Sequence, residues 1–396
     1  MYWPHRFNSA RPGQPRNRAP RRVRGFTLIE LMIGVVIGLV AALAVTQVMV
    51  GSENQKRTTT SGSDAQVNGA LALNTLQRSI QPAGYGFAAS PTSLGCAVTT
   101  SAAISALVPN FPTTLAPVVI TQGALGTPDT IRVLASGKTS YSVPLRIVPA
   151  GYNPANAAMK FQFPVASVAG VAGPNAGAGT PGDLMITMID STQPCEVFQV
   201  TANPSTVPPQ VPRADTPGFW NAAGFPAGSY VDGAELMNMG TIVDKTYSIG
   251  TASLRVTSLQ IAADSTPSYS APTELFSNIV NLKAMYGKET TGAGLGMVDT
   301  WDNVTPTTNA GWKQVVAVRL AIVARSATYE KDEVTAANPT WDVGSTGVAA
   351  LAGLATCPSG TSKCLNLKVD TPTDWKHYRY KVFDTVIPLR NMLWNS

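Results

Sequence analysis

Residues 26–50 read FTLIELMIGVVIGLVAALAVTQVMV, a stretch of 25 residues with a single ionisable side chain, Glu30, and this stretch decides the fold. An α-helix rises 1.5 Å per residue, so the segment would extend about 37 Å, whereas the hydrocarbon core of a bilayer is about 30 Å thick. The sequence therefore predicts a membrane-spanning helix at residues 26–50.

The segment before this span is strongly basic. Residues 1–25 hold seven arginines and no acidic residue, and without them the remaining 22 Lys and Arg nearly balance 23 Asp and Glu. Because basic residues stay on the cytoplasmic side, everything after about residue 50 is predicted to cross the membrane. The nearly neutral remainder displays no basic patch, so we expect no nucleic-acid partner.

Three interpretations compete for this N-terminal region. The first is a secretory signal peptide, for which Ala42-Leu43-Ala44 resembles a cleavage site, and the second is an uncleaved anchor. The third is cleavage on the cytoplasmic side, between Gly25 and Phe26, which keeps the apolar helix on the mature protein. An acid in an apolar span costs about 2.5 to 3.5 kcal/mol, and a new amino terminus at Phe26 would be a partner for Glu30.

Small residues recur every four positions in the span, at Gly34, Gly38 and Ala42. They would lie on one side of the helix, where small side chains let two backbones approach closely. This pattern is compatible with helix packing, but glycine is also common in ordinary membrane helices.

The predicted helix continues to residue 82. Apolar residues between 67 and 80 keep a helical spacing until Pro82 and Gly84 stop it, while the Thr- and Ser-rich residues 58–63 favour a break. The rest, residues 83–396, is rich in predicted strands, so the fold class is α+β: a long helix packed on an antiparallel β-rich head with large loop insertions. The predicted strands are 118–121, 130–134, 184–189, 197–200, 253–261, 315–324 and 378–386.

Other segments of the head are assigned by spacing and composition. The strand at 315–324 would place Val316, Val318, Leu320 and Ile322 on one face, and the spacing of apolar residues predicts a helix at 274–285. The stretches rich in Gly, Pro, Ala and Ser are expected to be exposed loops, and they lie at 168–182, 202–229, 287–311 and 335–362.

All four cysteines, Cys96, Cys195, Cys357 and Cys364, lie on the side predicted to be exported, where disulfides form. Four cysteines allow three pairings. The short separation of Cys357 and Cys364 favours a local bond, which would leave Cys96 with Cys195. The spacing lacks a paired C-x-x-C, so we expect no metal site here.

The sequence gives little support for an enzyme. After cleavage His377 would be the only histidine, and the Trp-Lys-His-Tyr-Arg run around it suggests a structural role. The G-x-G-x-x-G match at residues 177–182 contains Pro181 and precedes a strand, so it is interpreted as a loop. Asp299 to Asn303 offers oxygen atoms but not the spacing of a calcium loop, and a turn is expected. We predict no catalytic residues and no cofactor.

Several short motifs carry a family resemblance. Residues 24–30, RGFTLIE, resemble the processing site of type IV prepilins, with Gly before the cut, Phe as the new N-terminus and Glu as its fifth residue. Four further segments resemble minor pilins of the PilW family, and they are 76–86 (LQRSIQPAGYG), 278–287 (NIVNLKAMYG), 317–326 (AVRLAIVARS) and 378–391 (YRYKVFDTVIPLRN).

The resemblance implies a minor pilin that initiates pilus assembly and sits at or near the pilus tip. It implies cleavage by prepilin peptidase between Gly25 and Phe26, N-methylation of Phe26, and a Glu30 that guides docking. The expected partners are other minor pilins, the major pilin, a pilus-tip adhesin and the inner membrane. The head would be periplasmic before assembly and extracellular in the pilus afterwards.

Two alternatives stay open. A J-type pseudopilin of type II secretion shares the N-terminus and general fold, although the large head disfavours it. The other is a membrane-anchored exported binding or adhesin domain. The expected division is a leader at 1–25, the long helix at 26–82 and the head at 83–396.

Overall fold

A computed structural model describes residues 25–139, 143–175, 177–215, 219–292, 294–345, 347–348, 353–358 and 360–393. Residues 1–24 of the predicted leader, 1–25, lie outside the described residues. The chain divides into two compact units, residues 1–57 and 58–396, and each is described by itself.

The long helix is confirmed as α1, Leu28–Ile80. The break expected at residues 58–63 is not present, because the backbone there is helical. Extending a helix adds one hydrogen bond per residue, whereas restarting it repeats the cost of nucleation, so a few weak helix formers do not interrupt it. The helix ends as expected before Pro82, and Gly84 has a φ of 78°, which is accessible to glycine.

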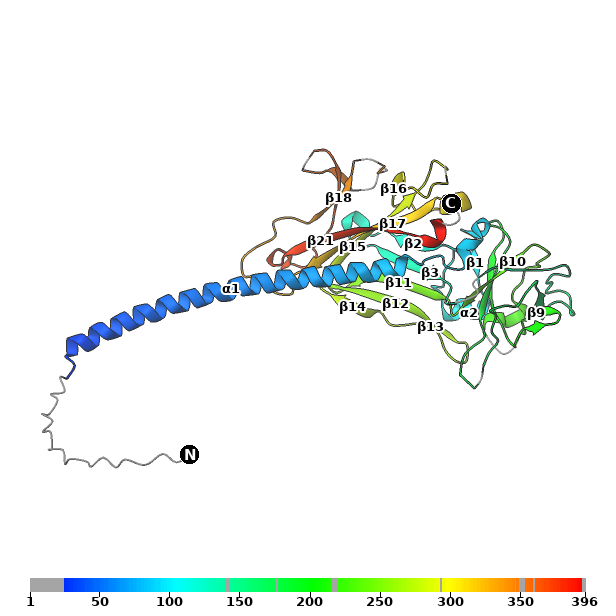
Figure 1. Ribbon diagram of the computed structural model, residues 1–396, viewed down its shortest axis with the longest axis horizontal. Helices are drawn as coiled ribbons and strands as arrows, with labels where there is room; N and C mark the ends of the chain where they lie inside the picture. Colours follow the sequence, from blue (N-terminus) through cyan, green and yellow to red (C-terminus); the bar gives the residue numbers. More distant parts are fainter. Residues whose placement is uncertain are drawn as a thin grey trace, which may run out of the picture. The chain divides into compact units, whose positions relative to one another are not determined.

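In the second unit, α1 lies against two antiparallel sheets (Figure 1). Ser79 Oγ is 2.5 Å from Tyr247 Oη on the first sheet, and Gly69 lies against the Phe383 ring on the second. The first sheet has six strands in the order β13-β12-β11-β3-β2, with β14 also paired to β12. Its strands are β2 (Val118–Thr121), β3 (Thr130–Ala135), β11 (Val243–Gly250), β12 (Ser253–Ile261), β13 (Pro267–Tyr269) and β14 (Thr273–Ser277).

The second sheet has four strands in the order β16-β15-β17-β21. They are β15 (Ile279–Lys288), β16 (Thr300–Asp302), β17 (Val315–Arg325) and β21 (Tyr380–Pro388). The helix predicted at 274–285 is wrong, because this segment forms β14 and β15, joined at Asn278 with a φ of 59°. Most of β15 is buried on both faces, so its apolar residues do not alternate and coincide with a helical spacing.

The described residues of the head form three further sheets. A five-stranded sheet contains β1 (Val98–Thr99), β4 (Leu145–Arg146), β6 (Leu184–Met188), β7 (Cys195–Gln199) and β10 (Glu235–Gly240). A three-stranded sheet contains β5 (Gln162–Pro164), β8 (Ser205–Thr206) and β9 (Pro209–Pro212). Another contains β18 (Thr340–Gly344), β19 (Leu354–Thr356) and β20 (Lys363–Asn366). Of the described strand pairs, only β1 with β7 is parallel. Three of the four predicted loops therefore contain short strands.

Short helices fill the connections. They are α2 (Ala102–Leu107), α3 (Asn309–Lys313) and α4 (Arg390–Leu393). Ser101 Oγ accepts a hydrogen bond from Ile104 N at 3.3 Å, and Thr308 Oγ1 accepts one from Gly311 N at 3.2 Å. These are N-caps, which explains why α2 and α3 begin where they do.

The buried side chains of the described part of the head form three hydrophobic clusters. The main core joins α1 to the two sheets beside it and includes Leu76, Leu320 and Ile322. An aromatic core contains Tyr152, Phe163, Phe198 and Tyr230. A C-terminal core joins the other face of β17 to β18 and β20. The antiparallel β-rich head expected after the long helix is confirmed.

The predicted face of β17 is correct except at one residue. Val318, Leu320 and Ile322 lie in the main core, but Val315 joins them instead of Val316. The ladder between β15 and β17 shifts register between Gly287 and Lys288. A β-bulge at this point moves the residues beyond it to the opposite face of the strand, so Val315 takes the place expected for Val316. The alternation of residues in the sequence does not reveal the bulge.

Candidate functional site

The N-terminal end of α1 contains the residues singled out for processing and assembly. Gly25, Phe26 and Thr27 precede the helix, and Phe26 is 84% exposed. Thr27 is the N-cap, because its carbonyl oxygen accepts the first helical bond, from Leu31 N at 3.2 Å. The peptide bond between Gly25 and Phe26 therefore lies in non-helical, exposed backbone next to the helix start.

Thr27 and Glu30 hold one another across the first turn. Thr27 Oγ1 accepts a hydrogen bond from Glu30 N at 3.3 Å. In return, Glu30 Oε2 accepts bonds from Thr27 N at 3.4 Å and from Thr27 Oγ1 at 3.2 Å. This is a capping box, and it orients the Glu30 carboxylate towards the amino end of the helix, where the helix dipole favours negative charge.

Thr27 is the site residue that the sequence reasoning missed. The T-x-x-E spacing before an apolar run is a recognisable signature of a capping box. Both side-chain bonds use Glu30 Oε2, and among the described contacts no donor reaches Oε1. Within the described residues, the carboxylate thus engages Thr27 through Oε2.

Among the described residues of its unit, 25–57, the apolar segment of α1 has no packing partner. Residues Leu28–Glu53 form a helix of 26 residues with a mean hydropathy of 2.7, long and apolar enough to cross a membrane, and none of its most apolar window is buried. A Cβ built on Gly34 or Gly38 meets no atom within 4 Å. Ala42 lies on the same helix, and its carbonyl oxygen accepts a bond from Thr46 Oγ1 at 2.9 Å. The small-residue face is therefore open.

The predicted disulfides are confirmed. Cys96 pairs with Cys195, with 5.9 Å between the Cα atoms. Cys357 pairs with Cys364, with 5.0 Å between the Cα atoms. The first bond ties the segment after α1 to β7, beside the parallel pairing of Val98 with Cys195. The second closes the turn between β19 and β20.

The remaining residues considered for chemistry have structural roles. His377 stacks on Tyr329 with 4.6 Å between ring centroids, and its Nδ1 is 2.9 Å from Glu330 O. The glycine run is a loop, as predicted, in which Asn175 Oδ1 accepts a hydrogen bond from Gly177 N at 3.1 Å.

The segment considered for calcium is partly a strand, β16, and not the expected turn. Asp299 accepts bonds from the main chain and hydroxyl of Thr290 at 2.7 Å, and its pKa is lowered by the hydroxyls of Thr290 and Thr300. Lys288 Nζ lies 2.7 Å from Asp302 Oδ1. These carboxylates are therefore occupied by donors of the protein.

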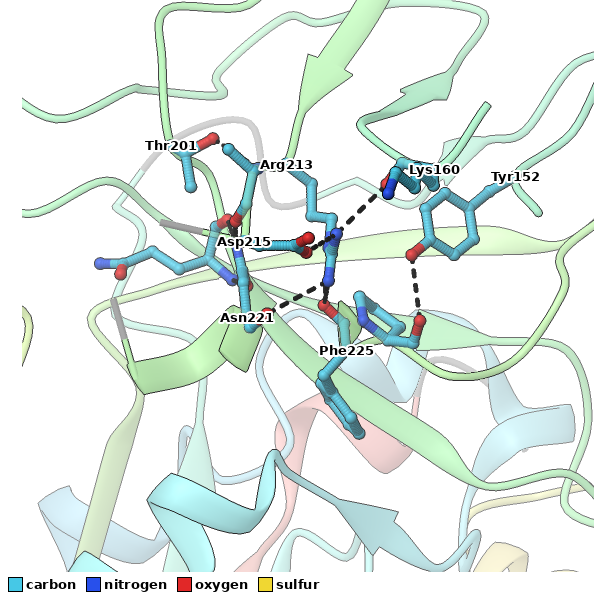
Figure 2. A network of polar contacts seen from close by, with 10 residues as sticks. Tyr152, Lys160, Thr201, Arg213, Asp215, Asn221 and Phe225 are labelled. Atoms are coloured by element: carbon cyan, nitrogen blue, oxygen red, sulfur yellow. Dashed lines mark hydrogen bonds and ion pairs between the residues drawn. The ribbon is translucent and has the colours of Figure 1, made fainter. Parts of the chain in front are cut away.

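A connected polar cluster surrounds Arg213 (Figure 2). This side chain is fully buried, and its guanidinium donates to Phe225 O, to Asn221 O at 3.2 Å and to Lys160 O at 3.3 Å. Asp215 Oδ1 pairs with it at 2.5 Å. Tyr152 Oη donates to Pro226 O at 3.0 Å in the same view. Because backbone carbonyls take most of the donors, the cluster holds a loop in place and does not present a reactive group.

Comparisons with known proteins give matches to family models and to a solved structure. Residues 242–391 match the model of the PilW family, type IV pilus-assembly protein W, and residues 20–46 match the prokaryotic N-terminal methylation motif. A type IV-like pilin from Thermus thermophilus is similar at 10% identity over 84% of this chain and 97% of its own, with a TM-score of 0.28. No curated protein matches. The resemblance to the PilW family is confirmed over residues 242–391, and the N-terminal region carries a methylation motif of the prokaryotic type.

Proposed function

We propose that this protein is a minor pilin that helps to initiate type IV pilus assembly and sits at or near the pilus tip. The observation that carries the proposal is the capping box between Thr27 and Glu30, at the head of an apolar helix with no buried residue in its most apolar window. A helix of this kind needs lipid before assembly and the helices of other subunits afterwards.

Processing would occur between Gly25 and Phe26, removing the leader at residues 1–25. The exposed, non-helical backbone there suits access by prepilin peptidase. The new amino group, methylated on Phe26, would remain cationic. The proposed mature protein consists of the long helix at 26–82 and the head at 83–396, anchored in the inner membrane with a periplasmic head until it enters the pilus.

Glu30 would act in docking. In an apolar bundle its carboxylate needs a cation, and the amino group of a neighbouring subunit supplies one. Thr27 already satisfies Oε2, so the incoming ammonium would meet Oε1. Pairing of this kind places one helix in register with the next, because the charged groups cannot be left unpaired in an apolar surrounding.

The size of the head supports a position at or near the tip. The described head contains five sheets, and we propose that a head of this size is best accommodated at an end of the filament, where it has fewer neighbours. Its partners would be other minor pilins and the major pilin, with a tip adhesin as a further partner. The role is structural and non-enzymatic, as the pilin-like family suggests.

The test replaces Glu30 by Ala in cells that assemble pili. We expect the amount of this chain in sheared pili to fall about tenfold, equivalent to about 1.4 kcal/mol, with an unchanged amount in the membrane. Glu53→Ala, at the other end of the same apolar helix, is the matched control and should incorporate normally. Equal incorporation of Glu30→Ala and wild type would contradict the docking role.

A further inference from the structure

β21 is an edge strand, because it pairs with β17 and with no other strand of its sheet. Two backbone hydrogen bonds at the ends of the β17–β21 ladder show which residues of β21 direct their N–H and C=O groups towards β17. Leu389 N donates to Val316 O at 2.9 Å, and Ser326 N donates to Arg379 O at 2.8 Å. Bonded pairs alternate along an antiparallel ladder, so the odd-numbered residues of β21 bond to β17.

The even-numbered residues of β21 therefore point their N–H and C=O groups away from the sheet. They are Tyr380, Val382, Asp384 and Val386, followed by Pro388, which has only its C=O. Among the described residues, no hydrogen bond reaches these backbone groups. Four donors in a row are thus presented along one edge.

Other edges in the head are shorter or covered. The outer edge of β2 is capped, since Ile120 N donates to Tyr286 Oη at 2.7 Å and Thr305 Oγ1 donates to Ile120 O at 3.2 Å. β14 has five residues and a register shift against β12. β21 has nine residues and pairs with β17 without any shift. Proteins usually protect edges by bulges, caps or short strands, so a long, regular and open edge indicates a pairing site.

The surroundings of β21 indicate what pairs with it. α1 passes this strand, because Gly69 lies against the Phe383 ring. On the same part of α1, Val67 and Leu71 are one turn apart and 54% and 51% exposed. A second pilin-like chain whose helix packs along α1 would therefore bring its head beside the β21 edge, next to the exposed side chain of Val386.

We propose that a β-strand of a second, different pilin-like chain adds to the edge of β21 and extends the four-stranded sheet. This inference rests on the proposed function, since it names the surface by which the head recognises another subunit. Backbone groups of Tyr380, Val382, Asp384 and Val386 supply the bonds, as in β-strand addition generally. A second copy of this chain fits less well: symmetric pairing of two β21 strands would run antiparallel and oppose the directions of the two α1 helices, whereas chains anchored in one membrane share one direction.

The test uses tagged full-length protein in detergent-solubilised membranes that contain the other pilin-like chains, each identified by mass spectrometry. Asp384→Pro removes one outward N–H and blocks the edge, but it leaves the hydrogen bonds between β21 and β17 in place. The natural Pro388 also occupies an even-numbered position, whose missing N–H would point away from β17. Asp384→Ala is the matched control, because it loses the same ion pair with Arg319 and keeps the N–H. We expect recovery of the partner to fall about tenfold in the proline variant relative to the alanine variant.

A second pair, Val386→Pro and Val386→Ala, repeats the comparison without touching that ion pair, in case Asp384→Pro unfolds. Residue-resolved hydrogen exchange on the wild type decides independently of any variant. Amides of Lys381, Phe383, Thr385 and Ile387 should be protected in the isolated chain, and those of the four outward residues should become protected only in the complex.

Three outcomes would overturn the edge pairing. Equal recovery with the proline and alanine variants, together with unchanged exchange of the outward amides, refutes it while leaving the proposed function intact. Protection that appears in the isolated chain with rising concentration would assign the edge to a second copy. Recovery of no pilin-like chain by the wild type would reject both the edge pairing and the proposed function.

Discussion

The two halves of α1 are parts of one continuous helix, yet they are built for different surroundings. In the first half, Gly34 and Gly38 have open space around them, and large apolar side chains such as Leu39 are 59% exposed. In the second half, Leu76 and Ile80 are fully buried in the head. The first half is apolar on every side and the second on one side, so among the described residues the second half alone packs against its own chain.

This contrast teaches that the core of the head is built on the second half of α1, whereas the apolar first half has no described part of the chain to pack against. Changes in the head or in the second half of α1 should therefore alter the stability of the head while leaving the first half of α1 helical in a bilayer or detergent.

Removing the Cys96–Cys195 bond should have the largest effect on the head. The bond closes a sequence separation of 99 residues, and the chain-entropy model gives about 4.7 kcal/mol for a loop of about 100 residues. Cys96→Ser with Cys195→Ser should therefore lower the free energy of unfolding far more than Cys357→Ser with Cys364→Ser, whose separation is only 7 residues. Urea unfolding monitored by tryptophan fluorescence measures the free energy of unfolding of both variants. Equal losses of free energy would contradict the pairing of Cys96 with Cys195 across the long loop.

Leu76→Ala should destabilise the head by about 2 to 5 kcal/mol, because it leaves a cavity in the main core. The control is Leu71→Ala on the same half of α1, where the side chain is 51% exposed, and its cost should be below about 0.5 kcal/mol. Similar losses in both variants would show that the second half of α1 does not pack as described.

Alkaline pH should unfold the head before it affects the first half of α1, which contains no tyrosine. Burial raises the pKa of Tyr152 to about 12, from an ordinary value of 10. Between pH 10 and 12 the Tyr152 phenol ionises in the unfolded chain but not in the folded protein. The stability that this group contributes is therefore fully present below pH 10 and is lost as the pH rises towards 12, by about 1.4 kcal/mol per pH unit.

Tyr152→Phe provides the control for this pH effect. The variant should lose a smaller part of its stability between pH 10 and 12 than the wild type does, because one buried phenol no longer titrates. Thermal unfolding monitored by circular dichroism at a series of pH values measures the difference. An unchanged pH dependence would mean that Tyr152 ionises freely in the folded protein.

The smallest expected difference is in the change of stability when each of two glycines of α1 is replaced by Ala. Gly62→Ala should stabilise the helix by up to about 1 kcal/mol, since a Cβ there meets nothing within 4 Å. At Gly69 a Cβ would overlap the ring of Phe383, so Gly69→Ala should be neutral or destabilising despite the same gain in helix propensity. Equal stabilisation by both substitutions would show that α1 and β21 are not in close contact.

Much of this organisation was predictable because the deciding features are local. The apolar run at residues 26–50, the stop at Pro82 and the bounds of β2 and β12 follow from composition and alternation. The disulfides followed from a short separation of Cys357 and Cys364. The T-x-x-E signature was equally local but was missed.

Other features depend on tertiary contacts. The β15 segment is predicted as a helix because burial on both faces removes the alternation of apolar and polar residues. That Val315 and not Val316 lies in the main core depends on a β-bulge in the pairing of β17 with β15. The open edge of β21 depends on which strand pairs with it, and no property of residues 380–388 taken alone reveals that.

The central claim is that the apolar half of α1 is kept on a mature subunit whose new N-terminus is Phe26. Mass spectrometry of the N-terminal peptide of the protein recovered from membranes and from pili tests it most directly. The account predicts a peptide that begins at Phe26 and carries one methyl group on its amine. A peptide that begins at Val45, or an intact Met1, would contradict it.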